Sequence, residues 1–223
     1  MNIFDIIGPV MVGPSSSHTA GAVRIGYLAR KLMGEPILEA RIGLCGSFWA
    51  TGRGHGTDRA LIAGLLGMKV DDEHIPQSFS LAQEAGLEFS FYEARIPDAH
   101  PNTAVLTLRG QSGDTMEIVA ASVGGGRVKV CQIDGLDANF YGELPTLVVQ
   151  NRDQPGHVSD IASMLAHKSI NIATMQLYRD SRGGRAVTVI ECDQEVPADG
   201  LKWLAHCEGM IKLVYLSMEE NNA

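Results

Sequence analysis

The last third of the chain carries a fixed order of hydrophobic patterns, which limits the folds open to it. Period-two patterns, typical of half-buried strands, alternate with one-face patterns typical of amphipathic helices. Turn formers such as Gln154-Pro155-Gly156 and Gly183-Gly184 separate them. The strand patterns are Thr146–Gln150, Ile170–Tyr178, Ala186–Cys192 and Ile211–Leu216, and the helix patterns are Val158–Leu165 and Leu201–Ala205. This order predicts a βαββαβ unit.

The residues before this unit predict a second sheet. The strand patterns are Ile37–Cys45, Leu87–Glu93, Thr103–Leu108, Met116–Ala120 and Arg127–Ile133. Helix patterns lie at residues 20–32 and 60–66, with a short one around 80–85. We expect an α+β protein, in which a mixed or antiparallel sheet with helices on one face precedes a ferredoxin-like βαββαβ unit. Periodicity lapses around Asp137–Pro145, so the predicted domains are 1–143 and 144–223.

Hydroxyl side chains and a histidine crowd the start of the first helix, in Gly13-Pro14-Ser15-Ser16-Ser17-His18-Thr19. The first N–H groups of a helix lack intrahelical acceptors and carry the positive end of its dipole. A substrate carboxylate would fit such a place. Serine and threonine before a helix are usually only caps, but a cap does not need His18.

A second histidine lies in Thr51-Gly52-Arg53-Gly54-His55-Gly56-Thr57-Asp58, which we interpret as a tight turn leading into a helix. Thr57 or Asp58 is a candidate N-cap. A third histidine lies in His100-Pro101-Asn102, ahead of a strand, where an ordinary loop is the simpler interpretation. Two histidine turns at helix starts in one small domain favour a shared site.

Composition narrows the classes of function. The net charge of −8 and the scattered Lys and Arg offer no basic patch to nucleic acid or an anionic membrane. Residues 1–7 carry no basic segment, and no apolar run approaches the ~20 residues of a membrane span, so we expect a cytoplasmic protein. The cysteines are far apart and are expected to be buried free thiols that hold no metal. They are Cys45, Cys131, Cys192 and Cys207.

The C-terminal unit resembles an ACT domain, the small-molecule regulatory module of amino-acid enzymes. The resemblance is carried by Asn151-Arg152-Asp153-Gln154-Pro155-Gly156-His157-Val158, with Asn171-Ile172-Ala173-Thr174-Met175 downstream. It implies an effector site and pairing of two such domains into a homodimer. The implied effector-binding residues are Asn151, Asp153, Pro155, Gly156 and His157.

The N-terminal part resembles the β chain of the bacterial iron-sulfur L-serine dehydratase family, through its three histidine motifs taken in order. The resemblance implies that the protein has a partner α chain whose cysteines hold a [4Fe-4S] cluster. The lack of a cysteine cluster here agrees with that division. The implied reaction is loss of water from L-serine to give pyruvate and ammonia. The residues leave open whether a monovalent cation is required and which effector the ACT unit takes.

The resemblance assigns roles that suit the chemistry. Histidine can move a proton near neutral pH, so His18 and His55 are the candidate catalytic residues, and which of them is the base stays open. The candidate substrate-binding residues are Ser15, Ser16, Ser17, Thr19, Thr57, Asp58, His100 and Asn102.

A second hypothesis has no catalysis. The N-terminal part also resembles, more distantly, the regulatory region of some D-3-phosphoglycerate dehydrogenases, which precedes an ACT domain. The chain would then be a serine- or anion-binding regulatory module. Such a site needs the serine-rich turn but not His55 and His100, which favours the enzyme.

Overall fold

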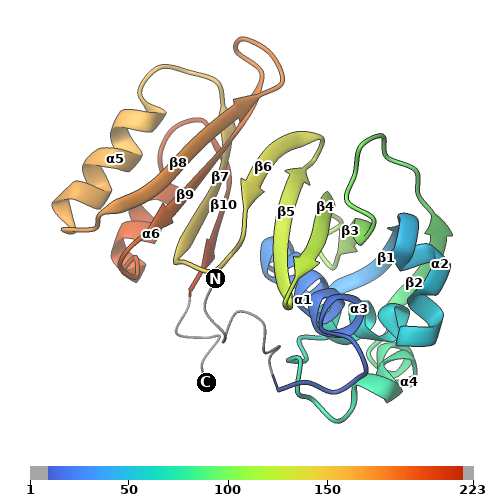
Figure 1. The fold of residues 1–223 in the computed structure, drawn as a ribbon. Helices are drawn as coiled ribbons and strands as arrows, with labels where there is room; N and C mark the ends of the chain where they lie inside the picture. The colour runs from blue at the N-terminus through green and yellow to red at the C-terminus, as the bar shows by residue number, and fades with distance from the viewer. Residues whose placement is uncertain (1–9, 218–223) are drawn as a thin grey trace. The chain divides into compact units, whose positions relative to one another are not determined.

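The computed structural model of the protein describes residues 10–217, and its ten labelled strands and six α-helices form an α+β fold (Figure 1). The helices are α1 (Gly21–Met33), α2 (Gly46–His55), α3 (Thr57–Leu65), α4 (Ser78–Glu84), α5 (His157–His167) and α6 (Ala198–Ala205). The strands are β1 (Ile37–Leu44), β2 (Glu88–Glu93), β3 (Thr103–Gly110), β4 (Thr115–Gly124), β5 (Arg127–Ile133), β6 (Leu136–Phe140), β7 (Thr146–Arg152), β8 (Ile172–Arg179), β9 (Arg185–Cys192) and β10 (Met210–Leu216). The predicted α+β class is confirmed.

The first sheet is mixed, with strand order β2-β1-β3-β4-β5-β6. β1 and β2 are parallel, whereas β1–β3, β3–β4 and β4–β5 are antiparallel. Turn segments connect β3, β4 and β5 as hairpins, as their glycine-rich sequences predict. All five strands predicted in this part of the chain are present.

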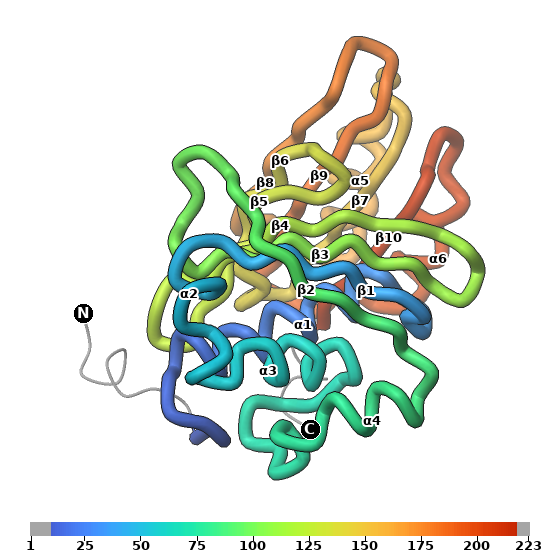
Figure 2. Tube along the Cα trace, turned by 90° about the vertical axis from the view of Figure 1, so that its right-hand side faces the viewer, coloured from blue at the N-terminus to red at the C-terminus, as the bar shows by residue number. Residues whose placement is uncertain are grey.

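Three helices cover one side of this sheet (Figure 2). α1 packs on β3, β4 and β5, α3 packs on α1, and α4 packs on α3. The α1–α3 crossing is close because glycines face each other. A Cβ on Gly26 would lie 2.2 Å from the Leu61 carbonyl oxygen, and one on Gly64 would lie 2.0 Å from the Val23 carbonyl oxygen. Only glycine fits at these two positions.

Two local predictions in this part of the chain were wrong. The glycine-rich stretch before Gly56 is the end of helix α2, so His55 lies at the C-terminus of a helix and not in a turn at a helix start. The N-cap of α3 is Gly56 with φ 69°, and neither Thr57 nor Asp58 caps it with its side chain. Buried Phe48 anchors α2 and compensates for the helix propensity that three glycines remove.

The segment with lapsed periodicity contains strand β6. Leu136, Ala138 and Phe140 are buried in alternation, and Asn139 between them has φ 50°. The chain divides into two compact units between Gly135 and Leu136, just before this strand. The predicted domains 1–143 and 144–223 place the boundary a few residues later.

The second sheet has strand order β10-β7-β9-β8, all antiparallel. With α5 after β7 and α6 after β9, this is the predicted βαββαβ unit. Its core is built from aliphatic side chains of β7, β9, α5 and α6, including Leu147, Val149, Ile161, Leu165 and Leu204. Both helices therefore bury their apolar stripes on the unit's own sheet.

Within residues 10–217, no helix is long and apolar enough to cross a bilayer. The expectation that the chain starts without a leader rests on residues 1–7, which lie outside the described residues. The cysteines are free, as predicted, but only Cys45 and Cys192 are fully buried, since Cys131 and Cys207 are half-buried.

The α1–α3 crossing gives a prediction about stability. We expect Gly64→Ala to lower the free energy of unfolding by about 1–3 kcal/mol, because the added methyl overlaps a backbone carbonyl oxygen. Urea denaturation measures this change. Gly54→Ala on α2 is the matched control, since nothing lies within 4 Å of its added methyl and helix propensity then stabilises by about 0.5–1 kcal/mol. If the Gly64→Ala protein were as stable as the parent, the close packing of α1 against α3 at this position would be contradicted.

Candidate active site

The histidine motif at the N-terminus folds into a π-helical turn, η2 (Ser16–Ala20), directly before α1. Ser15 is its N-cap, as the sequence predicts, and the Ser15 hydroxyl oxygen accepts a hydrogen bond from the His18 N–H at 3.1 Å. The Ala20 and Thr19 N–H groups both donate to the Ser15 carbonyl oxygen. Such wide turns are frequent at functional sites. The turn presents the His18 side chain half-buried beside α2.

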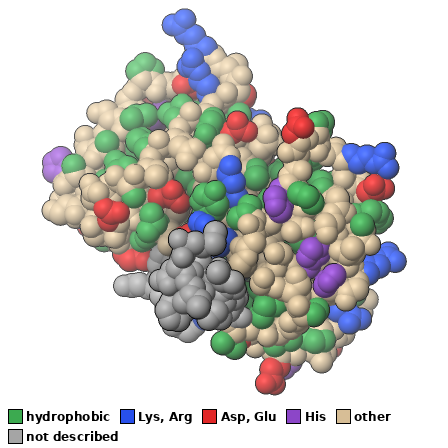
Figure 3. All heavy atoms as spheres, in the orientation of Figure 1, with side chains coloured by type: hydrophobic (Ala, Val, Ile, Leu, Met, Phe, Trp, Pro, Cys, Tyr) green, Lys and Arg blue, Asp and Glu red, His purple; other side chains and the backbone are tan. Residues whose placement is uncertain are grey.

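His18 and His55 lie next to each other, with ring centroids 4.8 Å apart and ring planes inclined by 35°. His18 also makes an edge contact with the buried ring of Phe48 at 5.5 Å. Histidine side chains gather at the surface of the N-terminal unit in Figure 3. The two candidate catalytic residues are thus brought together from η2 and the end of α2.

Two buried hydroxyls hold the backbones of the pair. The Thr19 hydroxyl donates to the His55 carbonyl oxygen at 3.0 Å, and the Thr57 hydroxyl donates to the His18 carbonyl oxygen at 2.8 Å. Thr19 is 3% exposed and Thr57 is not exposed at all, so water does not compete for these bonds. Both hydroxyls are committed to positioning the histidines.

Two further residues, which sequence reasoning missed, complete the site. The Nε2 atom of His18 lies 2.9 Å from the Ser47 hydroxyl and 3.2 Å from the Thr51 hydroxyl. The Thr51 hydroxyl donates to the Ser47 carbonyl oxygen at 2.9 Å. Ser47, Thr51 and His55 follow i, i+4 spacing on one face of α2. That stripe would have revealed them if residues 46–55 had been predicted to be helical.

The other candidate substrate-binding residues divide into three groups. Ser16 and Ser17 are half-buried, and in the described part of the chain their hydroxyls have no hydrogen-bond partner. Asp58 instead lines a separate pocket. His100 is exposed, and its Nδ1 accepts from the Asn102 N–H at 3.1 Å. No hydrogen bond or ring contact joins His100 to His18 or His55 within residues 10–217.

The His100–Asn102 turn still belongs to this region, because the Phe48 N–H donates to the Pro101 carbonyl oxygen at 3.3 Å, at the start of α2. Asn102 Oδ1 and the Ser122 hydroxyl are buried, and neither has a hydrogen-bond partner in the part of the chain that the structure describes. The Ser122 N–H donates to the Asn102 carbonyl oxygen. The backbone just before β3 is thus bonded to β4.

The electrostatics favour an uncharged His18. Burial is the main cause that holds the pKa of His18 below its usual 6.5, and the neighbouring His55 acts in the same direction. A hydrogen bond with the Ser47 backbone acts in the opposite direction and raises this pKa. His18 is therefore neutral at pH 7.

The effector-binding candidates lie between β7 and α5. Asn151 is 2% exposed, and its Oδ1 has no hydrogen-bond partner among residues 10–217. The Asp153 carboxylate binds Arg179 Nη1 at 2.7 Å and the Gly183 N–H at 3.0 Å. His157 is buried at the first position of α5, after Pro155 and the N-cap Gly156.

The fold and this site define a two-part α+β protein, whose N-terminal unit carries a histidine pair in a hydroxyl network. Comparison with known proteins agrees with this class. Residues 2–132 match the model of the serine dehydratase beta chain family, and residues 146–202 match that of the ACT domain. The chain belongs to the serine dehydratase beta chain family.

Its relatives share most of its length. The probable L-serine dehydratase beta chain of Bacillus subtilis is 38% identical over 97% of this chain and 98% of the relative. The L-serine dehydratase beta chain of Peptoniphilus asaccharolyticus is 36% identical over 86% of each. The D-3-phosphoglycerate dehydrogenase of Bacillus subtilis is 24% identical, over 88% of this chain but only 37% of the relative.

The lowered pKa of His18 gives a testable pH dependence. We expect its imidazole to titrate below 6.5 by NMR, assigned through the signal lost in His18→Gln, and to move upward in His55→Gln while staying below 6.5. The unfolded state binds more protons than the folded state in that window, so the free energy of unfolding falls as pH falls below 6.5. In His18→Gln, the free energy of unfolding should decrease less as the pH falls below 6.5. A titration above 6.5 would contradict the predicted burial effect.

Proposed function

We propose that this chain is the β subunit of an L-serine dehydratase, which works with a partner α chain. The reaction removes the Cα proton and the β hydroxyl of L-serine as water, and the resulting aminoacrylate hydrolyses to pyruvate and ammonia. Membership of the serine dehydratase beta chain family supports this assignment. The observation that carries it is the His18–His55 contact at 4.8 Å within a hydroxyl-rich helix start.

The substrate carboxylate is proposed to bind at the start of η2. Ser16 and Ser17 offer two hydroxyls without partners in the described residues, beside N–H groups that lack intrahelical acceptors. Ser15 has already committed its side-chain oxygen to the His18 N–H. The hydroxyls of Ser16 and Ser17 are therefore the ones proposed to bind the carboxylate.

His55 is proposed to accept the Cα proton. Its Nδ1 lies 3.1 Å from the Thr51 carbonyl oxygen, which can only accept, so Nδ1 carries the hydrogen. In neutral His55 the lone pair is then on Nε2, which has no partner in the described residues. His18 instead has its Nε2 in the Ser47–Thr51 hydroxyl network, where it orients the reacting groups.

The described residues of this chain do not fit an iron-sulfur cluster. They contain no group of three or more His, Cys, Asp or Glu that could hold a metal ion. Burial raises the pKa of the Cys192 thiol to about 11 and also raises that of Cys45, which keeps both thiols protonated. We therefore assign the [4Fe-4S] cluster, and the Lewis-acid chemistry that hydroxide departure needs, to the partner α chain.

The same proposal places the protein in the cytoplasm and pairs two copies through their ACT units. The experiment that tests the function is anaerobic co-purification with the chain encoded beside it, followed by iron analysis and an L-serine deamination assay. We expect iron and deamination only when the partner is present. Iron bound by this chain alone, or a reconstituted pair without L-serine deamination, would contradict the proposal.

Removing His55 is expected to have the larger effect on turnover. In the reconstituted enzyme, His55→Ala should lower kcat by about 10²–10⁴-fold, the usual contribution of a general base. His18→Ala should also lower kcat, because the Ser47 and Thr51 hydroxyls lose their contact with the imidazole. His206→Ala, at an exposed histidine directly after α6, is the control and should leave kcat unchanged. Near-normal turnover in both site variants would refute the assignment.

The regulatory alternative rests on the 24% identity to a D-3-phosphoglycerate dehydrogenase. It predicts L-serine binding without deamination, whatever partner is supplied. Calorimetric titration of the isolated chain with L-serine, next to the deamination assay, separates the two functions.

A further inference from the structure

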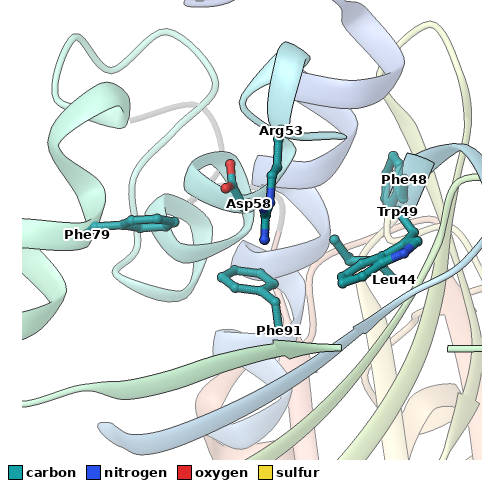
Figure 4. A pocket seen from close by; sticks show the side chains of 7 residues that line it. All are labelled: Leu44, Phe48, Trp49, Arg53, Asp58, Phe79 and Phe91. Carbon is teal, nitrogen blue, oxygen red and sulfur yellow. The ribbon is translucent and has the colours of Figure 1, made fainter. Parts of the chain in front are cut away.

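The N-terminal unit contains a pocket of about 500 Å³ that the histidine site does not use (Figure 4). It lies between α2, α3 and α4 on one side and β1 and β2 on the other. Its walls are largely aromatic, with Trp49 from α2, Phe79 from α4 and Phe91 from β2. The volume is in the range of small-molecule sites.

This pocket and the histidine site lie on opposite faces of α2. Ser47, Thr51 and His55 form one stripe at i, i+4 spacing, whereas Trp49 and Arg53 form another stripe about half a turn away. The first stripe carries the bonds to His18, and the second lines the pocket. The two sites therefore lie on different faces of one helix, and the ring of Phe48, which contacts His18, also lines the pocket.

Two side chains of opposite charge, Arg53 and Asp58, line the pocket, and neither forms an ion pair with a described residue. The Arg53 guanidinium makes no hydrogen bond or ion pair to any described residue. The hydrogen bond that Asp58 makes is a local one, from the Arg59 N–H to its Oδ1 at 2.8 Å. In Figure 4, Arg53 extends toward Phe91, and both Arg53 and Asp58 line the pocket. A cationic and an anionic group are thus both available to a ligand.

We propose that this pocket binds an α-amino acid with an apolar side chain. Arg53 binds the carboxylate, Asp58 binds the ammonium group, and the side chain packs against the aromatic walls. L-Serine fits poorly, because its hydroxyl would lose hydration against these rings without gaining a partner. Neither histidine lines this pocket, and the proposal does not depend on the proposed reaction.

The test uses the fluorescence of Trp49, which is 38% exposed at the pocket. The chain has two tryptophans, so in Trp203→Phe all tryptophan emission comes from Trp49. L-Leucine is expected to change this emission saturably, and calorimetry of the full-length chain should give the same Kd. L-Serine should bind at least about tenfold more weakly.

Testing three ligands against two variants shows which group of the ligand each charged side chain binds. Arg53→Met and Asp58→Asn should each weaken L-leucine about tenfold or more. Leucinamide, which lacks the carboxylate, should be insensitive to Arg53→Met, and 4-methylpentanoate, which lacks the ammonium group, should be insensitive to Asp58→Asn. Arg152→Met, at an exposed arginine of β7, is the matched control and should change nothing.

Three outcomes would overturn the proposal. They are no saturable binding of L-leucine by either method, equal affinity for L-serine, and equal sensitivity of all three ligands to both pocket variants. The first would leave the pocket to a segment of another protein chain. None of these outcomes bears on L-serine deamination, so the proposed function stands or falls separately.

Discussion

The site depends on a reciprocal pair of buried hydrogen bonds. Thr19 follows His18 and donates to the carbonyl oxygen of His55, and Thr57 follows the His55-Gly56 pair and donates to the carbonyl oxygen of His18. Each bond therefore ties the backbone of one histidine to the segment that carries the other. Breaking either bond would leave the hydroxyl of a buried threonine without this partner, which costs about 1–3 kcal/mol. These two bonds hold the two histidine backbones close together, and the contacts of the rings with Ser47 and Thr51 then orient the side chains.

That clamp requires η2 and the α2–α3 junction to approach closely, and the Gly26–Gly64 crossing of α1 and α3 allows it. With the backbones fixed, polar side chains at the surface of the site are left with different tasks. The Thr19 and Thr57 hydroxyls form the two backbone bonds, and those of Ser47 and Thr51 contact His18 Nε2. The Ser16 and Ser17 hydroxyls have no hydrogen-bond partner among the described residues. Some hydroxyl groups of this sequence therefore position the histidines, and others can form hydrogen bonds with a ligand.

The sequence predicts those features that depend on local periodicity. The βαββαβ order, the hairpins of the first sheet and the Ser15 cap could all be predicted, because each is encoded within a few residues. Helix α2 could not, because Gly46, Gly52 and Gly54 lower its intrinsic propensity and packing of Phe48 decides its state. Strand β6 was missed for a similar reason, since Asp137 and Asn139 obscure the buried alternation at Leu136, Ala138 and Phe140. Missing α2 also meant missing Ser47 and Thr51, whose spacing has meaning only on a helix.

A ten-residue helix with three glycines would not be stable in isolation, so α2 exists because both of its faces and its first turn are held by the rest of the unit. Phe48 is fully buried, and its N–H donates to the Pro101 carbonyl oxygen, which ties the third histidine motif to the helix start. One face then presents His55 to His18, and the other presents Trp49 and Arg53 to the aromatic pocket. Because the helix has little stability of its own, the geometry of each face depends on the contacts of the other. This coupling is how segments far apart in the sequence are held together around α2.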